Sequence, residues 1–169
     1  MKRHVAIYPG SFDPITNGHL DIITRGLEVF DQLIIAVARN SEKNALFSVD
    51  ERVTLIRALL VDNHRVRVDT FDGLLVDYVA QQNANVILRG LRAVSDFEYE
   101  FQLAQMNHTV QPAVETLFMM TSVPYGYLSS SIVKEVASHQ GPVDEFVPGV
   151  VKEALEQKFR QRRENGENR

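Results

Sequence analysis

The sequence predicts an α/β protein in which helices flank a parallel β-sheet, and three observations support this prediction. Short β-branched runs alternate along the chain with stretches whose apolar residues recur at helical spacing. Two of the short runs, 33–38 and 116–121, are apolar on both faces, which is typical of parallel strands covered on both sides. Glycines, hydroxyl residues and arginines gather just after the predicted strands, where ligands bind in such sheets.

The expected elements alternate along most of the chain, and strand–helix–strand units of this kind join parallel strands by right-handed crossovers. The predicted strands are residues 4–8, 33–38, 65–71, 85–88 and 116–121. The predicted helices are residues 16–30, 48–61, 74–82, 95–107, 129–138 and 148–163.

Local signals support individual helices. The first helix carries an apolar stripe at helical spacing, formed by Leu20, Ile23, Leu27 and Phe30. Capping boxes predict two helix starts, one at Ser48 with Glu51 and one at Ser95 with Glu98. Pro148 suits the first position of the last helix, because proline lacks the N–H that this position leaves unused.

Composition limits the classes of protein to consider. The chain has 169 residues, 44% of them apolar, which is enough for one domain with a sizeable core, and we expect a domain over 1–163 and a polar tail over 164–169. The net charge of −4 argues against a nucleic-acid coat protein. The sequence holds no cysteine, which excludes disulfides and thiolate zinc sites. The longest apolar run, 33–38, is too short to span a bilayer, so we expect a cytoplasmic protein without a membrane partner.

The first motif is YPGSFDPITNGHLDII, residues 8–23, between the first strand and the first helix. We expect Thr16 to cap this helix and His19 to fall in its first turn, where free backbone amides suit a phosphate. Gly10 and Gly18 allow a nucleotide to approach the backbone, and the imidazole can donate to a phosphate oxygen. The alternative is a capping loop whose histidine only packs against its neighbours.

The second motif is RGLR, residues 89–92, followed by an acidic and aromatic run. Two guanidinium groups match the oxygens of two phosphates. The alternative is an arginine pair that bridges to carboxylates such as Asp96 or Glu98.

Two further segments lie next to predicted strands. YGYLSSS, residues 125–131, follows the fifth strand, and its serines offer helix caps and anion-facing amides, or only a serine-rich cap. Lys43 lies in a polar loop before the helix at Ser48, where a lysine is usually just solvated. Such a loop can also close over a substrate and bring a flexible ammonium group to it.

The first string resembles the nucleotidyltransferase signature, in which a T/H-x-G-H tetrad meets the ATP phosphates. More narrowly, all four segments resemble those of the bacterial phosphopantetheine adenylyltransferases, from about residue 6 to the last helix. Two positions differ from the family pattern: Ser11 stands where threonine is frequent, and Leu128 stands for isoleucine. The resemblance implies a Rossmann-like nucleotidyltransferase fold with a five-stranded parallel sheet. It also implies transfer of the adenylyl group of ATP to 4′-phosphopantetheine, which gives dephospho-CoA and pyrophosphate in coenzyme A biosynthesis.

The resemblance also implies roles for individual residues. Catalysis falls to His19 and Lys43. The residues expected to bind phosphopantetheine are Ser11, Lys43, Leu75, Arg89 and Asn107. The residues expected to bind ATP are Ser11, Phe12, His19, Gly90, Leu91, Arg92, Glu100, Tyr125, Gly126, Tyr127, Leu128, Ser129, Ser130 and Ser131. Leu75 and Asn107 also read as a core leucine and an asparagine at a helix end.

Cofactor and assembly follow from the same resemblance. No protein metal cage is expected, and Mg²⁺ should arrive held by the nucleotide phosphates. The family implies a homohexamer and feedback inhibition by CoA. Two other functions stay open: a nucleotidyltransferase with another phosphorylated acceptor, such as a nicotinamide or glycerol phosphate, and a non-catalytic nucleotide-binding module. A tRNA-handling synthetase fragment is disfavoured, since the chain lacks the bulk and positive charge for RNA.

Overall fold

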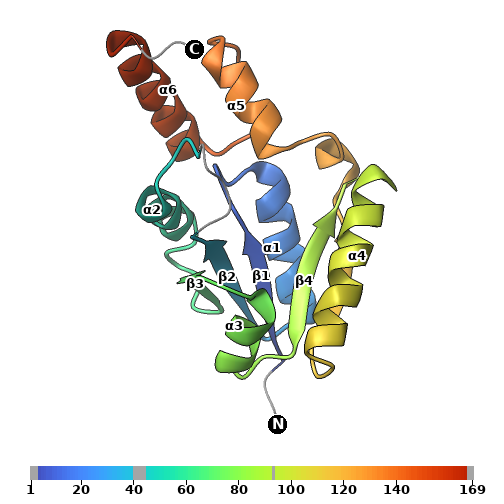
Figure 1. Cartoon of the computed structure of the whole chain (residues 1–169). Coiled ribbons are helices and arrows are strands. Elements are labelled where there is room, and N and C mark those ends of the chain that lie inside the picture. Colours follow the sequence, from blue (N-terminus) through green and yellow to red (C-terminus); the bar gives the residue numbers. More distant parts are fainter. Residues whose placement is uncertain (1–3, 40–44, 93, 167–169) are drawn as a thin grey trace.

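A five-stranded, entirely parallel sheet forms the centre of the molecule (Figure 1). The structure is a computed structural model that describes residues 4–39, 45–92 and 94–166. Its strand order is β3-β2-β1-β4-β5. The strands are β1 (Val5–Gly10), β2 (Gln32–Ala38), β3 (Val66–Phe71), β4 (Val86–Leu91) and β5 (Glu115–Met120). The predicted α/β class and the parallel sheet are confirmed.

Two strands run further than the sequence predicted. β1 continues to Gly10 because its last residues stay in register with β2, where Gly10 lies opposite Val37. β4 continues through Arg89 and Gly90 because both stay paired with β5. Proline and glycine are rare in strands, so Pro9, Gly10 and Gly90 did not indicate these extensions. Both extensions belong to strand ends that line the site described below.

The expectation that both apolar strands are covered on both faces is right for β2 and wrong for β5. β2 is buried from Leu33 to Val37 and lies inside the sheet. β5 lies at the sheet edge, where Leu117 and Met120 are 46% and 58% exposed. An apolar run shows that side chains avoid water, but it does not show which neighbour covers them, so an edge strand and a central strand look alike in sequence.

The predicted helices are present, with shifts at their ends. They are α1 (Asn17–Val29), α2 (Val49–Leu59), α3 (Leu75–Gln81), α4 (Val94–Val110), α5 (Ser130–Ser138) and α6 (Gly149–Glu164). A short 3₁₀ helix, η1 (Val123–Tyr125), was not predicted. Within the described part of the chain, none of these helices has the length and apolarity needed to cross a membrane.

Of three predicted helix starts, one is confirmed and two are shifted by one residue. Ser48 caps α2 in a capping box with Glu51, as predicted. The helix predicted to start at Ser95 begins at Val94, three residues after the extended end of β4. Pro148 is the N-cap of α6 rather than its first helical residue, and its carbonyl accepts from the amide of Lys152.

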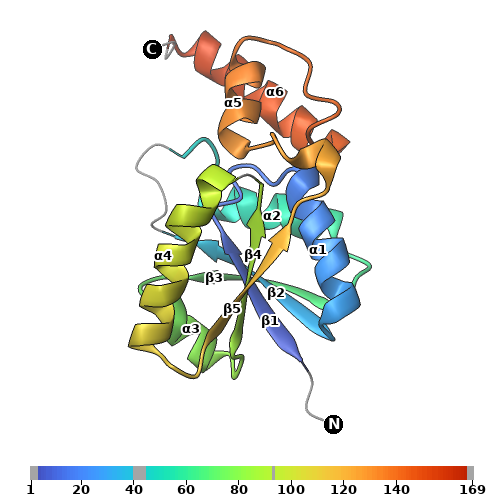
Figure 2. The same ribbon diagram turned by 90° about the vertical axis from the view of Figure 1, so that its right-hand side faces the viewer.

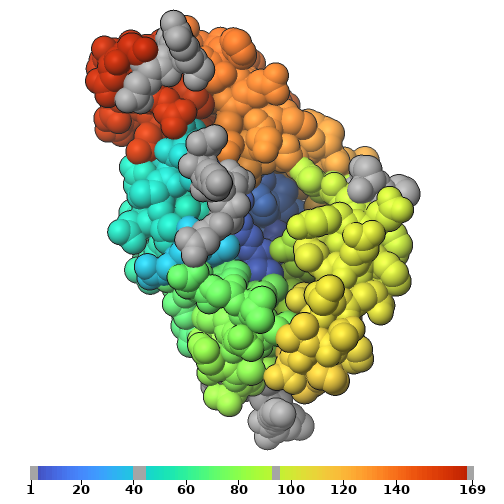
Figure 3. Space-filling model, in the orientation of Figure 1, coloured from blue at the N-terminus to red at the C-terminus, as the bar shows by residue number. Residues whose placement is uncertain are grey.

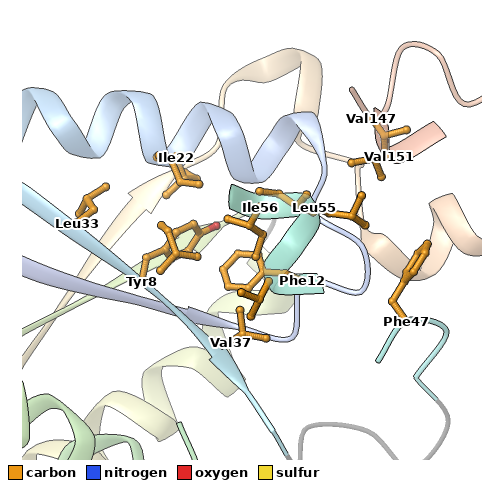
Figure 4. Close-up of a cluster of buried hydrophobic side chains, with 14 of the residues drawn as sticks. Tyr8, Phe12, Ile22, Leu33, Val37, Phe47, Leu55, Ile56, Val147 and Val151 are labelled. Carbon is orange, nitrogen blue, oxygen red and sulfur yellow. The ribbon is translucent and has the colours of Figure 1, made fainter. Parts of the chain in front are cut away.

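Side chains of the sheet alternate between two apolar clusters, one on each face. On β2, Leu33, Ile35 and Val37 join the larger cluster, and Ile34 and Ala36 join the smaller one, with residues of α3. Figure 4 shows part of the larger cluster, in which Ile22 of α1 and Ile56 of α2 lie near Tyr8 and Phe12. This core fixes the strand ends, and therefore the loops that follow them.

Helices α5 and α6 lie side by side beyond the carboxyl end of the sheet (Figures 1 and 2). Hydrogen bonds join this pair to the start of α1. The amide of Asn17 donates to the carbonyl of Phe146 at 2.9 Å, and the side-chain amide of Asn17 donates to the carbonyl of Glu145 at 2.9 Å. The hydroxyl of Ser130 donates to the carbonyl of Pro14 at 2.7 Å. These bonds place the N-terminus of α5 over the loop that follows β1.

Asp13 is a buried carboxylate that connects three segments, and its side chain is only 1% exposed. It accepts hydrogen bonds from the backbone amides of Leu46 at 2.9 Å and Phe47 at 2.8 Å. Its third partner is the ammonium group of Lys134 on α5, at 2.7 Å. The loop after β1, the approach to α2 and helix α5 are therefore joined at one charged group.

Replacing this carboxylate should destabilise the fold. In Asp13→Asn the shape is kept, but the neutral amide cannot accept from all three donors and removes the negative charge beside the ammonium group of Lys134. We expect the free energy of unfolding to fall by about 3 kcal/mol or more. Urea titration followed by circular dichroism measures it, with Asp62→Asn on an exposed turn as the matched control. Equal unfolding midpoints for the two variants would show that the buried carboxylate does not contribute this stability.

Candidate active site

A cavity of about 430 Å³ lies at the carboxyl ends of β1 and β4. These two strands are neighbours in the sheet, and the chain order reverses between them, which is where ligands bind in open parallel sheets. Segments that follow β1, β4 and β5 line the cavity, together with the first turns of α1 and α5. Figure 3 shows the N-terminal part of the chain, in blue, at the floor of a hollow between the flanking segments.

The loop after β1 has a conformation that only certain residues allow. Phe12 adopts a left-handed backbone, with φ of 48°, and its ring is almost fully buried. The ring lies so close to Gly10 that a Cβ atom there would come within 2.9 Å of it. Phe12 packs edge-on against Tyr8 and His19, with ring centroids 5.4 and 5.1 Å away. The absence of a side chain at Gly10 therefore leaves room for the Phe12 ring to pack against the imidazole of His19.

His19 closes a capping box at the start of α1. The backbone amide of Thr16 donates to its Nδ1 atom at 3.0 Å. Because an amide N–H can only donate, Nδ1 acts as an acceptor, and a neutral ring then carries its proton on Nε2. Burial, together with the charges of Arg92 and Arg89, lowers the pKa of His19 to about 4. At neutral pH the cavity therefore contains an uncharged imidazole whose Nε2–H is left to donate.

Arg89 and Arg92 are held in the same way by different groups. Arg89 donates from Nε to Glu100 at 2.7 Å, from Nη2 to the same carboxylate, and from Nη1 to the carbonyl of Pro9 at 3.0 Å. Arg92 uses Nε and Nη2 on Asp96, at 2.9 and 3.2 Å, and Nη1 on the carbonyl of Leu128 at 3.2 Å. A guanidinium group has five N–H donors, so these contacts orient each arginine and leave donors for a ligand.

The alternative interpretation of the RGLR motif is thus partly right. Both arginines do bridge to carboxylates, but the partners are Asp96 and Glu100 rather than Glu98. Burial lowers the pKa of Arg89, and the bonded, charged Glu100 more than offsets this, so the net pKa is raised and the guanidinium stays charged. Both arginines also line the cavity, so pairing and ligand binding are compatible there.

The third wall of the cavity is the segment between β5 and α5. Asp21 of α1 anchors its start, since its carboxylate accepts from the amide and the hydroxyl of Ser122 at 3.0 and 2.7 Å. Ser129 caps α5 by accepting from the amide of Ile132 at 3.1 Å. The first turns of α1 and α5 therefore meet at one cavity, where the positive ends of both helix dipoles favour an anion.

Most of the residues proposed from sequence line this cavity. They are Ser11, Phe12, His19, Arg89, Gly90, Arg92, Glu100, Tyr125, Leu128, Ser129, Ser130 and Ser131. Gly126 and exposed Tyr127 lie in the same segment without lining the cavity, and Leu91 is a buried core residue at the end of β4. Lys43 lies outside the described residues.

The two residues proposed for the pantetheine arm lie apart from this cavity. Leu75 begins α3 and packs against the smaller apolar cluster. Asn107 is on α4 and is not at a helix end, because that helix continues to Val110. Neither side chain lines the cavity, so the sequence-based roles of these two residues stay predictions.

Several cavity residues were missed by the sequence-based assignment. They include Tyr8, Asp96, Tyr99 and Thr121. Helical spacing carries a signal for two of them, since positions 96, 99 and 100 fall on one face of α4. Tyr8 belongs to a strand, and burial raises the pKa of its phenol well above the usual range despite both nearby arginines, so it stays protonated. Nothing in its sequence context separates it from a core tyrosine.

The titration of His19 gives a direct test of its environment. We expect ¹⁵N NMR of the ring at pH 7 to show Nε2 protonated and Nδ1 not, with a midpoint near pH 4. The unfolded chain takes up this proton near pH 6.5. Stability should therefore fall as the pH drops from 6.5 toward 4, and the fall should be smaller in His19→Gln. A midpoint near 6.5, or the opposite tautomer, would contradict the geometry described above.

Comparisons with known proteins agree with this geometry. Residues 7–136 match the cytidylyltransferase-like family. The phosphopantetheine adenylyltransferase of Geobacter metallireducens is 72% identical over 94% of this chain and 98% of its own. The one from Geobacter sulfurreducens is 69% identical, over 94% and 97%. A solved structure from Vibrio parahaemolyticus, described as a nicotinate-nucleotide adenylyltransferase, shares the fold with a TM-score of 0.68 at 17% identity, over 94% of this chain and 96% of its own.

Three findings lead to the same assignment. The cavity lies where the strand order reverses between β1 and β4, and it contains a histidine fixed by a capping box beside two oriented arginines. The curated relatives match nearly the whole chain. The chain belongs to the cytidylyltransferase-like family and, within it, to the phosphopantetheine adenylyltransferases.

Proposed function

We propose that this protein transfers the adenylyl group of ATP to 4′-phosphopantetheine, releasing pyrophosphate and forming dephospho-CoA. The names of its close relatives support this activity. The structural observation that carries it is the neutral imidazole of His19, fixed through Nδ1 at the junction of two helix N-termini and two arginines. Such a site suits a polyanion whose charge grows during reaction, since all its donors are oriented beforehand.

The chemistry requires alignment rather than proton abstraction. A phosphate oxygen of phosphopantetheine attacks the α-phosphorus of ATP, the bond to the β-phosphate oxygen breaks, and pyrophosphate leaves with the electron pair. The attacking phosphate is already ionised at neutral pH, so no strong base is needed. The protein's role is to hold both anions in line and to stabilise charge on the transferred phosphoryl group.

Each cavity residue then has a specific task. His19 donates from Nε2 to an oxygen of the transferred phosphoryl group, and its neutral state makes it a donor that needs no counter-charge. Arg89 and Arg92 offer the N–H groups that Glu100 and Asp96 leave unused. The serines at the start of α5 and the amides of its first turn bind further phosphate oxygens. Ser11 lies between the two substrates.

Mg²⁺ fits this site as a partner of the nucleotide rather than of the protein. Over the described residues, 4–39, 45–92 and 94–166, no cluster of three or more His, Cys, Asp or Glu side chains can hold a metal ion. The carboxylates of Asp96 and Glu100 are engaged by arginines. We propose that Mg²⁺ arrives on the ATP phosphates, where it neutralises part of their charge.

The proposed role of Lys43 is to guide the attacking phosphate. It precedes Leu46 and Phe47, whose amides are fixed by Asp13, so the chain on its C-terminal side is anchored near the cavity. Steady-state constants of Lys43→Ala test the role: KM for phosphopantetheine should rise more than KM for ATP. A selective loss for ATP would contradict it.

We also propose assembly into a homohexamer. Exposed apolar side chains on α4 and β5 support self-association, because exposed apolar patches of this kind mark interaction sites. They are Phe97, Phe101, Met106, Val110, Leu117 and Met120. Sedimentation velocity tests the state, and a monomer at micromolar concentration would contradict it. CoA inhibition and a cytoplasmic location stay predictions, of which initial rates with added CoA test the first.

Loss of the imidazole should affect turnover more than substrate binding. We expect His19→Ala to lower kcat about 100-fold or more, as for removal of one oriented transition-state donor, with smaller changes in both KM values. A coupled pyrophosphate assay with ATP and phosphopantetheine measures this. The variant also loses half of a capping box, so its melting temperature must be checked in parallel.

His64→Ala, on an exposed turn, is the matched control for that experiment and should keep wild-type rates. Near wild-type turnover in folded His19→Ala would disprove the assigned role. The same assay with nicotinate mononucleotide or glycerol 3-phosphate as acceptor separates this activity from other nucleotidyl transfers. Binding of ATP without product from any acceptor would instead indicate a nucleotide-binding module.

A further inference from the structure

A second cavity, of about 440 Å³, lies between α5 and α6 and is distinct from the first in its lining. Its walls are the C-terminal end of α5, the connecting segment 140–144 and one face of α6. The α6 residues that line it are Lys152, Leu155, Glu156, Phe159, Arg160 and Arg163. Their spacing of three and four places them on a single helix face. The two cavities share no lining residue.

The floor of this cavity is apolar. Val143 and Leu155 are 3% and 0% exposed and belong to the larger apolar cluster, against which Ala137 and Phe159 also pack. A volume of this size falls in the range of small-molecule sites, and half of the residues that line it are polar or charged. The floor therefore suits the carbon body of a ligand rather than a bare inorganic ion.

Arg163, which lines the cavity, has a buried donor without an acceptor. The Nη1 atom of Arg163 is buried and has no hydrogen-bond partner, and it is the only buried side-chain nitrogen or oxygen in this condition among the described residues. Burying a charged N–H without an acceptor is unfavourable, and native proteins rarely leave such a group unsatisfied. Arg163 is thus a cation that lines the cavity and has a donor that no other described residue satisfies.

The remaining charges at the cavity add up in the same direction. Lys152 is paired with Asp144, so these two charges offset each other. Arg160 lines the cavity and takes part in no salt bridge within the described ranges, which leaves two arginines against the single carboxylate of Glu156. The cavity is therefore net positive at the end where Arg160 and Arg163 lie, one turn apart on α6.

We propose that this second cavity binds a small organic anion. A phosphate monoester or carboxylate head group pairs with the guanidinium groups of Arg160 and Arg163. The apolar body of the ligand packs on Ala137 and Phe159, next to the buried methyl groups of Val143 and Leu155. Guanidinium groups suit both head groups, because each presents two oxygens to the N–H fork. The proposal rests on this cavity alone and does not depend on the activity at the first cavity.

Methyl-selective NMR of the full chain tests the proposal, with phenyl phosphate and benzoate as probes. Either probe should shift the methyl signals of Val143 and Leu155 in a saturable way. Arg163→Gln should weaken that binding about tenfold or more, since a charged hydrogen bond is lost. Arg162→Gln, an exposed neighbour on the same helix that does not line the cavity, is the matched control and should bind like the wild type.

Four results would overturn the proposal. The first is that neither phenyl phosphate nor benzoate, at millimolar concentration, shifts the methyl signals of Val143 and Leu155. Equal affinity in Arg163→Gln and Arg162→Gln would contradict it too, as would benzyl alcohol binding as tightly as phenyl phosphate. Arg160→Gln is a second variant to use if Arg163→Gln fails to fold, and it should lower the affinity severalfold. An unchanged affinity in Arg160→Gln is the fourth result that would contradict the proposal.

Discussion

The buried carboxylate of Asp13 is the interaction on which the rest of the structure depends. It lies directly after the residues that form the floor of the catalytic cavity, and it holds the approach to α2 through two amides and α5 through Lys134. A buried charge is stable only where donors surround it, and this one has three from two other segments. The cavity walls come from parts of the chain far apart in sequence, so their relative position depends on such a connection.

A second constraint is the balance of charge around the imidazole. Glu100 and Asp96 hold the two arginines in place by hydrogen bonds, and burial together with the charges of these arginines keeps His19 neutral. The carboxylates reduce the net positive charge of the cavity while they orient the guanidinium groups. A polyanion therefore meets donors that are already positioned, and little reorganisation is needed when charge develops on the reacting phosphoryl group.

Local patterns were sufficient wherever the structure is locally determined. The β-branched runs identified all five strands, and the caps predicted at Thr16 for α1 and, from the S-x-x-E spacing, at Ser48 for α2 are confirmed. The failures are tertiary. The helix predicted to start at Ser95 begins at Val94 instead, shortly after β4, whose last residues pair with β5. The exposed face of β5 depends on what lies beside it. The Arg92–Asp96 pair is four residues apart and readable, whereas Asp13 has partners 33, 34 and 121 residues away, which no local spacing reveals.

The double use of His19 has an entropic consequence. Its ring nitrogen completes the first turn of α1, so the imidazole loses its rotamer freedom when the chain folds and not when a nucleotide arrives. Association then carries no further ordering cost at that side chain. The same hydrogen bond orders the start of α1 and orients the imidazole. A sequence change that frays this helix end therefore also disturbs the position of the catalytic group.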